Sequence, residues 1–222
     1  DGDLGEKWYD VWAQDVCDFA DYIGVKKFFY TGHSHGAGIG WHLCLNHPDR
    51  VIAFFASAAG PHKKDGVETG KARMDTIIAA QSKETWIPYA QKMGNYCSKA
   101  FDAMLNNPEE AEAARKAKQQ TIDFWVNMPQ ATAIINPRKP FTKIKTEEEL
   151  ANVMAKIKTP TLLLGSCDDD ISPPELMIRS LRNLPDAKLV IFKDADHVDL
   201  PLKYHKEYAM EIVSFCKEKE LI

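Results

Sequence analysis

One short stretch constrains this chain more than any other: a serine between two glycines, directly after an apolar run. Residues 28–31 are suited to a strand, and Gly32-His33-Ser34-His35-Gly36 follows at once. A serine in the pattern G-x-S-x-G stands on a sharp strand-to-helix turn that pushes its hydroxyl out of the sheet. Side chains at Gly32 and Gly36 would collide with the neighbouring strand or helix, so we expect both glycines to be required. The backbone N–H of His35 would begin the helix, where it can face a developing oxyanion.

The hydrophobic pattern on either side of this stretch predicts alternating strands and helices. Strand–helix–strand units of this spacing imply a parallel sheet, and Gly24 is expected to end the helix before the first strand. We therefore predict an α/β fold, with a mostly parallel sheet and flanking helices formed by residues 1–61 and 159–222. The expected strands are 26–31, 51–57, 159–165 and 188–193, and the expected helices are 6–23, 37–46, 175–184 and 202–218.

The intervening range, 62–158, has a different pattern and contains no convincing strand. We expect an inserted helical cap with helices near 69–81 and 108–126, and a third that Thr146 and Glu149 open as a capping box. The aromatic and methionine side chains of this range are expected mainly to form its own core. A few would line an apolar substrate pocket, and we take His62, at the cap entrance, and Trp125 as candidates.

Composition narrows the class of protein further. A chain of 222 residues with 45% hydrophobic and 27% charged residues can form one core, and its net charge of −4 gives no reason to expect binding to nucleic acid or to an anionic membrane. No apolar run approaches the roughly 18 residues that span a bilayer. Five scattered cysteines indicate free thiols in a reducing compartment, so we expect a cytoplasmic protein.

Three polar positions each follow a predicted strand: Ser34, the aspartates 168–170 and His197. Because the carboxyl ends of parallel strands lie along one edge of a sheet, we expect these side chains to meet there. Serine, aspartate and histidine in this chain order form the catalytic triad of one class of hydrolases. The position of the strand alone does not choose among the aspartates.

In these features the chain resembles the α/β-hydrolase fold superfamily, specifically its cap-bearing branch of esterases, lactonases and carbon–carbon bond hydrolases. The resemblance covers the elbow, His47-Pro48-Asp49-Arg50 before one strand, Thr159-Pro160 before the next and the turn at His197. It implies that the acid precedes a proline in the pattern D-x-I-x-P, which points to Asp169, with Asp168 as the second choice. The neighbouring carboxylates would then be solvated.

The resemblance implies a serine hydrolase, a carboxylesterase-like enzyme without a cofactor, that cleaves an ester or related acyl bond of a small, partly apolar substrate. His197 would take the proton of Ser34, and Asp169 would orient the imidazole. The same triad also suits a carbon–carbon bond hydrolase, a lactonase or an acyltransferase. A non-catalytic ligand-binding receptor on the same fold is a further alternative, and a homodimer stays open.

The two histidines of the elbow have simpler expected roles than metal binding. Adjacent ligands and a second shell are not evident, so we predict no metal site. His33 is expected to pack or form a hydrogen bond beneath the turn, with contact to substrate as the alternative. The side chain of His35 is expected to lie along the cleft.

The chain departs from the family at its N-terminal side. The family has about four more strands before the helix at Glu6, and a His-Gly-type loop that supplies a second oxyanion amide. Neither is present in this sequence, so we expect the C-terminal portion of a longer protein. Produced alone, these residues would form an incomplete sheet with an exposed edge and show little or no hydrolysis.

Overall fold

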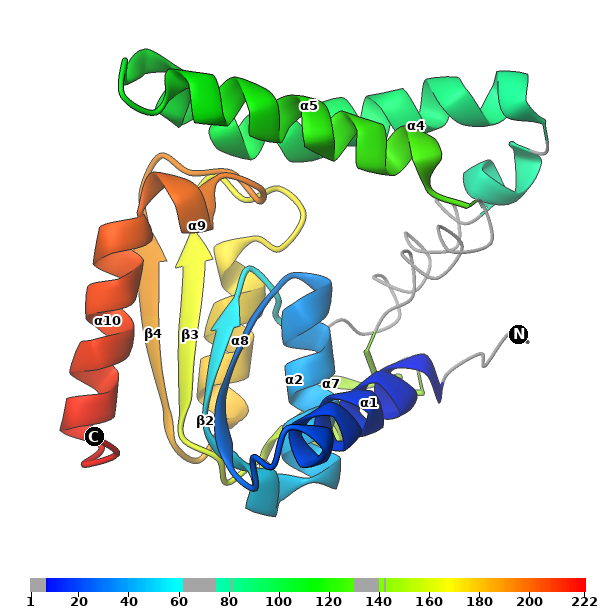
Figure 1. Ribbon diagram of the computed structural model, residues 1–222. Coiled ribbons are helices and arrows are strands. Elements are labelled where there is room, and N and C mark those ends of the chain that lie inside the picture. Colours follow the sequence, from blue (N-terminus) through cyan, green and yellow to red (C-terminus); the bar gives the residue numbers. More distant parts are fainter. Residues whose placement is uncertain (1–6, 62–74, 81, 130–139, 142) are drawn as a thin grey trace.

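Four parallel strands form a single sheet in the order β1-β2-β3-β4 (Figure 1). The computed structural model describes residues 7–61, 75–80, 82–129, 140–141 and 143–222. All four predicted strands are confirmed, and their pairing is parallel throughout. Within the described residues β1 pairs only with β2 and so stands at an edge of the sheet. The strands are β1 Phe28–His33, β2 Val51–Ser57, β3 Thr161–Ser166 and β4 Ala187–Phe192.

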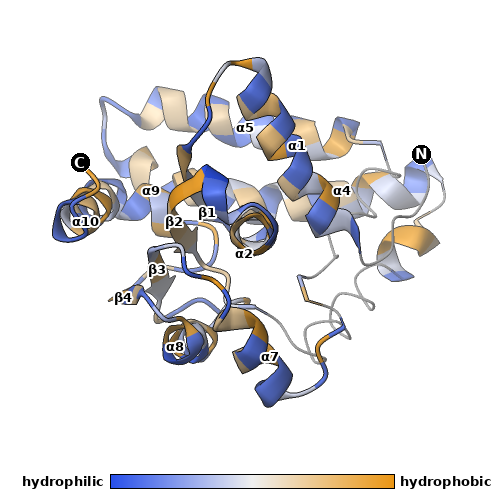
Figure 2. Ribbon diagram, turned by 90° about the horizontal axis from the view of Figure 1, so that it is seen from below, coloured by the Kyte–Doolittle hydropathy of each residue, from blue (hydrophilic) through white to orange (hydrophobic). Residues whose placement is uncertain are grey.

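Helices cover both faces of this sheet, as an α/β fold requires. In Figure 1, α2 and α8 lie on one face and α10 lies on the other, with α1 packed outside α2. The outer helices α7, α8 and α10 carry hydrophilic and hydrophobic residues on different sides (Figure 2). The helices of this part are α1 Trp8–Tyr22, α2 His35–Asn46, α7 Glu147–Met154, α8 Pro174–Asn183, α9 Leu200–Lys203 and α10 His205–Glu218, with a 3-10 turn, η2, at Pro48–Arg50.

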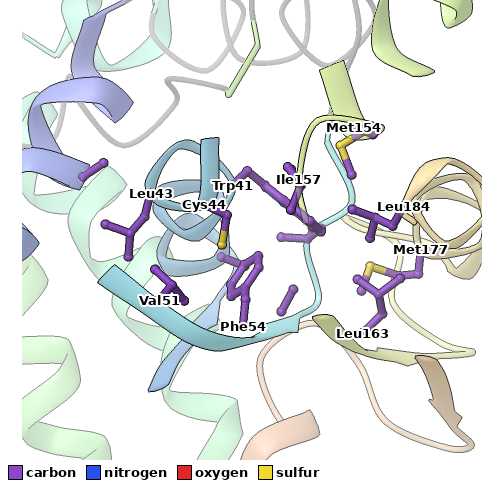
Figure 3. Close-up of a cluster of buried hydrophobic side chains, with 14 of the residues drawn as sticks. Trp41, Leu43, Cys44, Val51, Phe54, Met154, Ile157, Leu163, Met177 and Leu184 are labelled. Carbon is purple, nitrogen blue, oxygen red and sulfur yellow. The ribbon is translucent and has the colours of Figure 1, made fainter. Parts of the chain in front are cut away.

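Alternate residues along the strands point to the two faces and form two separate cores. On the α2 and α8 side, Phe54 and Leu163 pack around Trp41, as Figure 3 shows. On the α10 side, Phe55 and Leu162 pack against other side chains, with Phe215 from α10 among them. Both strands are therefore apolar on both faces, which explains why β2 and β3 read as continuous hydrophobic runs.

Local signals at helix ends were predictive. Gly24 has a φ of +76°, and the N–H of Val25 bonds to the carbonyl of Ala20, so this glycine closes α1 as expected. The capping box of Thr146 and Glu149 is present at α7. The predicted terminal helix is instead two helices, α9 and α10, separated at Tyr204, whose hydroxyl donates to the carbonyl of Lys193.

A separate helical layer lies across the carboxyl ends of the strands (Figure 1). Its elements are α4 Lys83–Ser98, the 3-10 segment η3 Lys99–Asn106 and α5 Ala111–Asn127. The helices α4 and α5 pack side by side, and η3 contacts α9, which closely follows His197. Residues 75–79 are also helical, within the range predicted for the first cap helix.

The helix α4 was not predicted. Pro88 lies inside it and cannot donate to the carbonyl four residues earlier, which obscures the helical pattern in the sequence. Two signals nevertheless mark it. Ser82 and Thr85 form a capping box at its start, and Trp86, Tyr89 and Met93 recur at helical spacing on one side.

The helix α7 lies inside the range 62–158 that we predicted as the cap, yet it packs with the sheet. Its buried residues Leu150 and Met154, and Ile157 just beyond its end, belong to the core beneath α2 and α8. Packing thus divides the chain before α7 and not at residue 158. Among the described residues, no helix is long and apolar enough to cross a membrane.

Candidate active site

The turn after β1 holds Ser34 in a strained backbone conformation. Its φ is 53° and its ψ is −115°, in a region that residues with a side chain rarely adopt. The N–H of Ser34 donates to the carbonyl of Ser57 at 2.9 Å, and the carbonyl of Ser34 accepts from the N–H of Gly38 at 3.0 Å. Bonds to the sheet on one side and to α2 on the other therefore hold the strained turn in place.

The two glycines of the elbow have different roles. A Cβ on Gly32 would lie 2.3 Å from the carbonyl carbon of Gly36, so the strand and the first turn of the helix approach too closely for any side chain there. A Cβ on Gly36 would meet nothing within 4 Å. The expectation that Gly36 is sterically required was therefore wrong, because the close approach involves its backbone and not the space beside its Cα.

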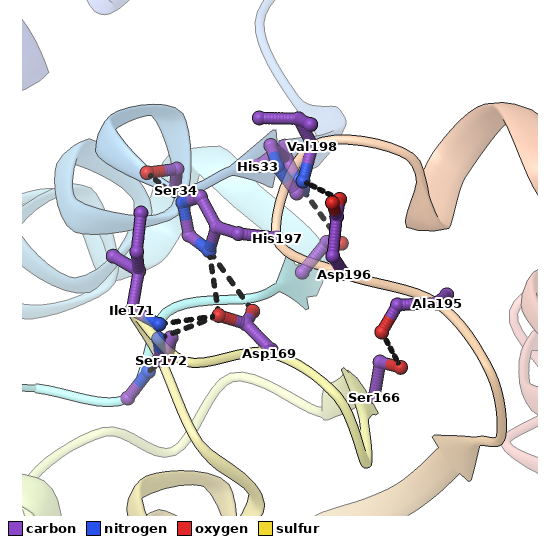
Figure 4. Close-up of polar contacts among 12 residues, drawn as sticks. His33, Ser34, Ser166, Asp169, Ile171, Ser172, Ala195, Asp196, His197 and Val198 are labelled. Carbon is purple, nitrogen blue, oxygen red and sulfur yellow. Dashed lines mark hydrogen bonds and ion pairs between the residues drawn. The ribbon is translucent and has the colours of Figure 1, made fainter. Parts of the chain in front are cut away.

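The structure brings Ser34, Asp169 and His197 together, although 163 residues separate Ser34 from His197 in sequence (Figure 4). Nε2 of His197 lies 2.9 Å from Oγ of Ser34. Nδ1 of His197 lies 3.0 and 2.9 Å from the two carboxylate oxygens of Asp169. An ionised carboxylate only accepts, so the imidazole carries its hydrogen on Nδ1, and Nε2 is left to accept from the serine hydroxyl.

The surroundings of Asp169 keep it charged. It is 2% exposed, and its Oδ1 accepts from the backbone N–H groups of Ile171, at 3.0 Å, and Ser172, at 2.7 Å. Burial alone would raise the pKa of Asp169, but the bond to His197 and these backbone donors outweigh burial and hold that pKa below its usual value. The neighbouring Asp168 and Asp170 are exposed, as expected for solvated turn residues.

A second pair of aspartates shapes the turn that carries His197. The carboxylate of Asp196 accepts from the N–H groups of Val198 and Asp199, and the carboxylate of Asp199 accepts from the N–H of Asp196. Burial raises the pKa of Asp199, and the nearby Asp196 charge adds to this effect. The analysis of the sequence did not assign these roles, although Asx turns of this kind are readable from aspartates two or three residues apart.

His33 lies directly beside the imidazole of His197. The two ring centroids are 5.2 Å apart, and Nδ1 of His33 is 3.0 Å from Oγ of Ser57. Burial, followed by the proximity of His197, lowers the pKa of His33 to about 4. His33 is therefore neutral at neutral pH and adds no positive charge next to an imidazole that must itself become charged.

A small pocket opens beside Ser34 and His197. Its volume is about 30 Å³, enough for one or two water molecules. Ala58, Ala59, Pro140 and Ile171 form its apolar wall, and Tyr9, His35 and Ser172 contribute its polar wall. Sequence reasoning placed His35 along a cleft but did not find Tyr9, because this residue comes from α1, which precedes the elbow strand.

Two candidate binding residues are not near this pocket or lie outside the description. Trp125 is 7% exposed and packs with Trp86, Ala90 and Ile77 between the cap helices. It is not among the described residues that line the pocket. His62 lies outside the described residues. No group of three His, Cys, Asp or Glu side chains that could hold a metal ion occurs in the described part of the chain.

The fold and the arrangement of the site define a class, and the comparison with known families agrees. The profile described as "alpha/beta hydrolase fold" matches residues 7–204, which is most of the chain. This protein therefore belongs to the alpha/beta hydrolase fold family. The four-strand sheet with its flanking helices is the part of that fold that these residues form.

Particular relatives are more distant. The chain is 27% identical over 192 residues to a protein of Azorhizobium caulinodans named "Putative carbamate hydrolase RutD", and it spans 65% of the length of that relative. A hydrolase from Pseudomonas aeruginosa superposes with a TM-score of 0.70 at 16% identity, covering 95% of this chain and 72% of the other. An esterase from Thermogutta terrifontis gives a TM-score of 0.66 at 21% identity, covering 96% and 74%. At these identities the two structures show the shared fold alone.

Proposed function

We propose that this protein is a serine hydrolase that cleaves a carboxylic ester or a related acyl bond of a small, partly apolar substrate. The observation that carries the proposal is the position of one imidazole. His197 lies at 2.9 Å from the hydroxyl of Ser34 through Nε2 and at 2.9 Å from the carboxylate of Asp169 through Nδ1. A hydroxyl is a weak nucleophile until a base removes its proton, and this arrangement supplies the base and its orientation.

The reaction follows from these contacts. Oγ of Ser34 attacks the carbonyl carbon as its proton passes to Nε2 of His197, and the ionised Asp169 stabilises the imidazolium. The bond to the leaving alcohol then breaks, and the alcohol takes that proton. Water repeats the sequence on the acyl-enzyme, which releases the acid and restores Ser34. The backbone N–H of His35, at the start of α2, would stabilise the oxyanion, and one such donor lowers the barrier by roughly 3 kcal/mol.

Three observations bear on the substrate and the setting. The polar and apolar walls of the pocket suit a small, partly apolar molecule. The name of the Azorhizobium relative adds carbamates to the acyl compounds worth testing. All five cysteines are free thiols in the structure, which supports a reducing, cytoplasmic location.

The same residues are compatible with related chemistry. Carbon–carbon cleavage, lactone opening and acyl transfer begin with the same nucleophile, and pocket shape and water access decide among them. A ligand-binding receptor would share the fold without turnover. Hydrolysis remains the function that the bonding of Ser34, Asp169 and His197 supports best.

The test is covalent labelling with a fluorophosphonate, followed by peptide mapping. We expect stoichiometric labelling at Ser34, no labelling in Ser34→Ala, and labelling slowed by about a thousandfold or more in His197→Ala. Asp168→Asn serves as a control, since this carboxylate is exposed. A folded protein that takes up no label, or takes it up at another residue, would refute the proposal. A series of p-nitrophenyl esters then measures acyl-chain preference.

A further inference from the structure

The pocket beside Ser34 has polar groups that the proposed mechanism leaves unused. Tyr9 from α1 and His35 from α2 both line it, and Oη of Tyr9 lies 2.7 Å from Nδ1 of His35. We propose that this pair determines specificity: Tyr9 fixes the tautomer of His35, and the Nε2–H of His35 binds a hydrogen-bond acceptor in the acyl part of the substrate. The inference rests on the proposed hydrolase function, because it concerns the same pocket.

Packing holds the ring of Tyr9 on several sides. The ring stacks between those of His42, at 5.4 Å, and His35, at 6.1 Å, and the ring of Trp12 meets it edge-on at 5.2 Å. Its Cε1 lies so close to Gly38 that a Cβ there would stand 2.5 Å away. Tyr9 is only 2% exposed. Its hydroxyl therefore has one position, as a group that orients another side chain requires.

The support extends behind Tyr9. His42 stacks on Phe141 at 4.8 Å, and its Nδ1 lies 2.7 Å from a carboxylate oxygen of Asp10. The four rings of Phe141, His42, Tyr9 and His35 thus form a continuous column that ends at the pocket. Phe141 follows Pro140, which lines the same pocket. The column connects the chain returning from the cap to the residue after Ser34.

The protonation states follow from this environment. Burial raises the pKa of Tyr9 well above its usual value, so the phenol keeps its hydrogen. His35 is the first residue of α2, where the positive end of the helix dipole disfavours an imidazolium. A neutral imidazole has one donor and one acceptor. When the phenol donates to Nδ1, the donor of His35 is Nε2–H.

A fixed donor on this wall discriminates between acyl groups. An ether, hydroxyl or carbonyl oxygen of the substrate would accept from Nε2–H, whereas a methylene in the same place would leave the donor without its partner. Sites built around a hydrogen bond select strongly against analogues that lack the bonding atom. We therefore expect acyl groups with an oxygen near the scissile carbonyl to be preferred over plain alkyl groups of the same size.

Two esters of equal size measure this preference. In p-nitrophenyl methoxyacetate an ether oxygen replaces one methylene of p-nitrophenyl butyrate, and the ratio of their kcat/KM values is the readout. Comparing this ratio between variants cancels the different intrinsic reactivities of the two esters. We expect the ratio to fall about tenfold in Tyr9→Phe and in His35→Leu, as loss of one buried hydrogen bond predicts. Tyr22→Phe, on the same helix but 88% exposed, should leave it unchanged.

A spectroscopic measurement tests the tautomer without activity. The ¹⁵N spectrum of the His35 imidazole should show hydrogen on Nε2 in the native protein and a mixture of tautomers in Tyr9→Phe. Hydrogen on Nδ1 in the native protein overturns the inference, as does hydrolysis of both esters with a ratio unchanged in Tyr9→Phe and His35→Leu. Failure to hydrolyse either ester, together with absence of fluorophosphonate labelling, overturns the proposed function and this inference with it.

Discussion

Gly32 lies so close to Gly36 that a single added methyl group could not fit between them: a Cβ on Gly32 would stand 2.3 Å from the carbonyl carbon of Gly36. We expect Gly32→Ala to destabilise the protein by about 3 kcal/mol, at the upper end of over-packing, because the contact is with backbone that cannot move aside. Urea unfolding followed by circular dichroism measures the change.

The matched variant is Gly36→Ala, which changes the other glycine of the same turn. Open space lies beside its Cα, and alanine favours a helix over glycine by up to about 1 kcal/mol. Its unfolding midpoint should equal or exceed that of the native protein. Equal destabilisation by both substitutions would contradict the distinction drawn between the two glycines.

Replacing Asp169 should abolish most of the proposed activity without unfolding the protein. Asp169→Asn keeps the size of the side chain but no longer favours hydrogen on Nδ1 of His197, and losses of about 10⁴-fold in kcat follow from such a change in a triad. Steady-state hydrolysis of a p-nitrophenyl ester measures it. Asp168→Asn should change kcat less than about twofold, and a large loss there instead would identify Asp168 as the acid.

His33 should make stability depend on pH in a defined window. Its pKa is about 4 in the folded protein, against 6.5 for an ordinary histidine. Between these values the unfolded chain binds a proton that the folded one does not, so the free energy of unfolding falls as pH is lowered from about 6.5 to 4, by up to about 3 kcal/mol.

Urea unfolding at pH 7 and at pH 4.5 measures this dependence in the native protein and in His33→Gln. The variant should lose less stability between the two pH values, because it has no group to protonate at this position. His205→Gln, at an exposed position, is the control and should behave as the native protein does. An unchanged slope in His33→Gln would show that His33 is not the group responsible.

Trp125 should matter for stability more than for substrate binding. Its indole is buried against Trp86 between the cap helices, and truncating a buried tryptophan costs about 3–5 kcal/mol. Trp125→Ala should therefore lower the thermal unfolding temperature. A raised KM at an unchanged unfolding temperature would support instead the expectation that Trp125 contacts substrate.

Tyr96 on α4 presents the opposite case, a group whose removal should help. Its hydroxyl is buried without a hydrogen-bond partner. Burial, followed by the nearby charges of Asp170, Asp196 and Asp169, raises its pKa. Tyr96→Phe should stabilise the protein by about 1 kcal/mol, because an unsatisfied polar group leaves the interior. Thermal unfolding measures this, with the exposed Tyr22→Phe as control, and a clear loss of stability would contradict it.

The fold was largely readable because its signals are local. The strands β2 and β3 are continuous apolar runs, Gly24 closes α1, and Thr146 caps α7, and each follows from a few adjacent residues. The helix α4 was missed because Pro88 interrupts its pattern. The division between cap and core was misplaced at α7, since only packing shows which core Leu150 enters.

The sequence by itself determined the elbow around Ser34, the parallel order of the strands and the three loops from which a triad would come. The tertiary structure alone decided how those loops meet: that Asp169 and not Asp168 faces His197, that Gly32 and not Gly36 is confined, and that Tyr9 reaches His35 from another helix. The reason is physical. Backbone preferences and hydrophobic periodicity act over a few residues, whereas contacts between side chains depend on the packing of elements distant in the chain.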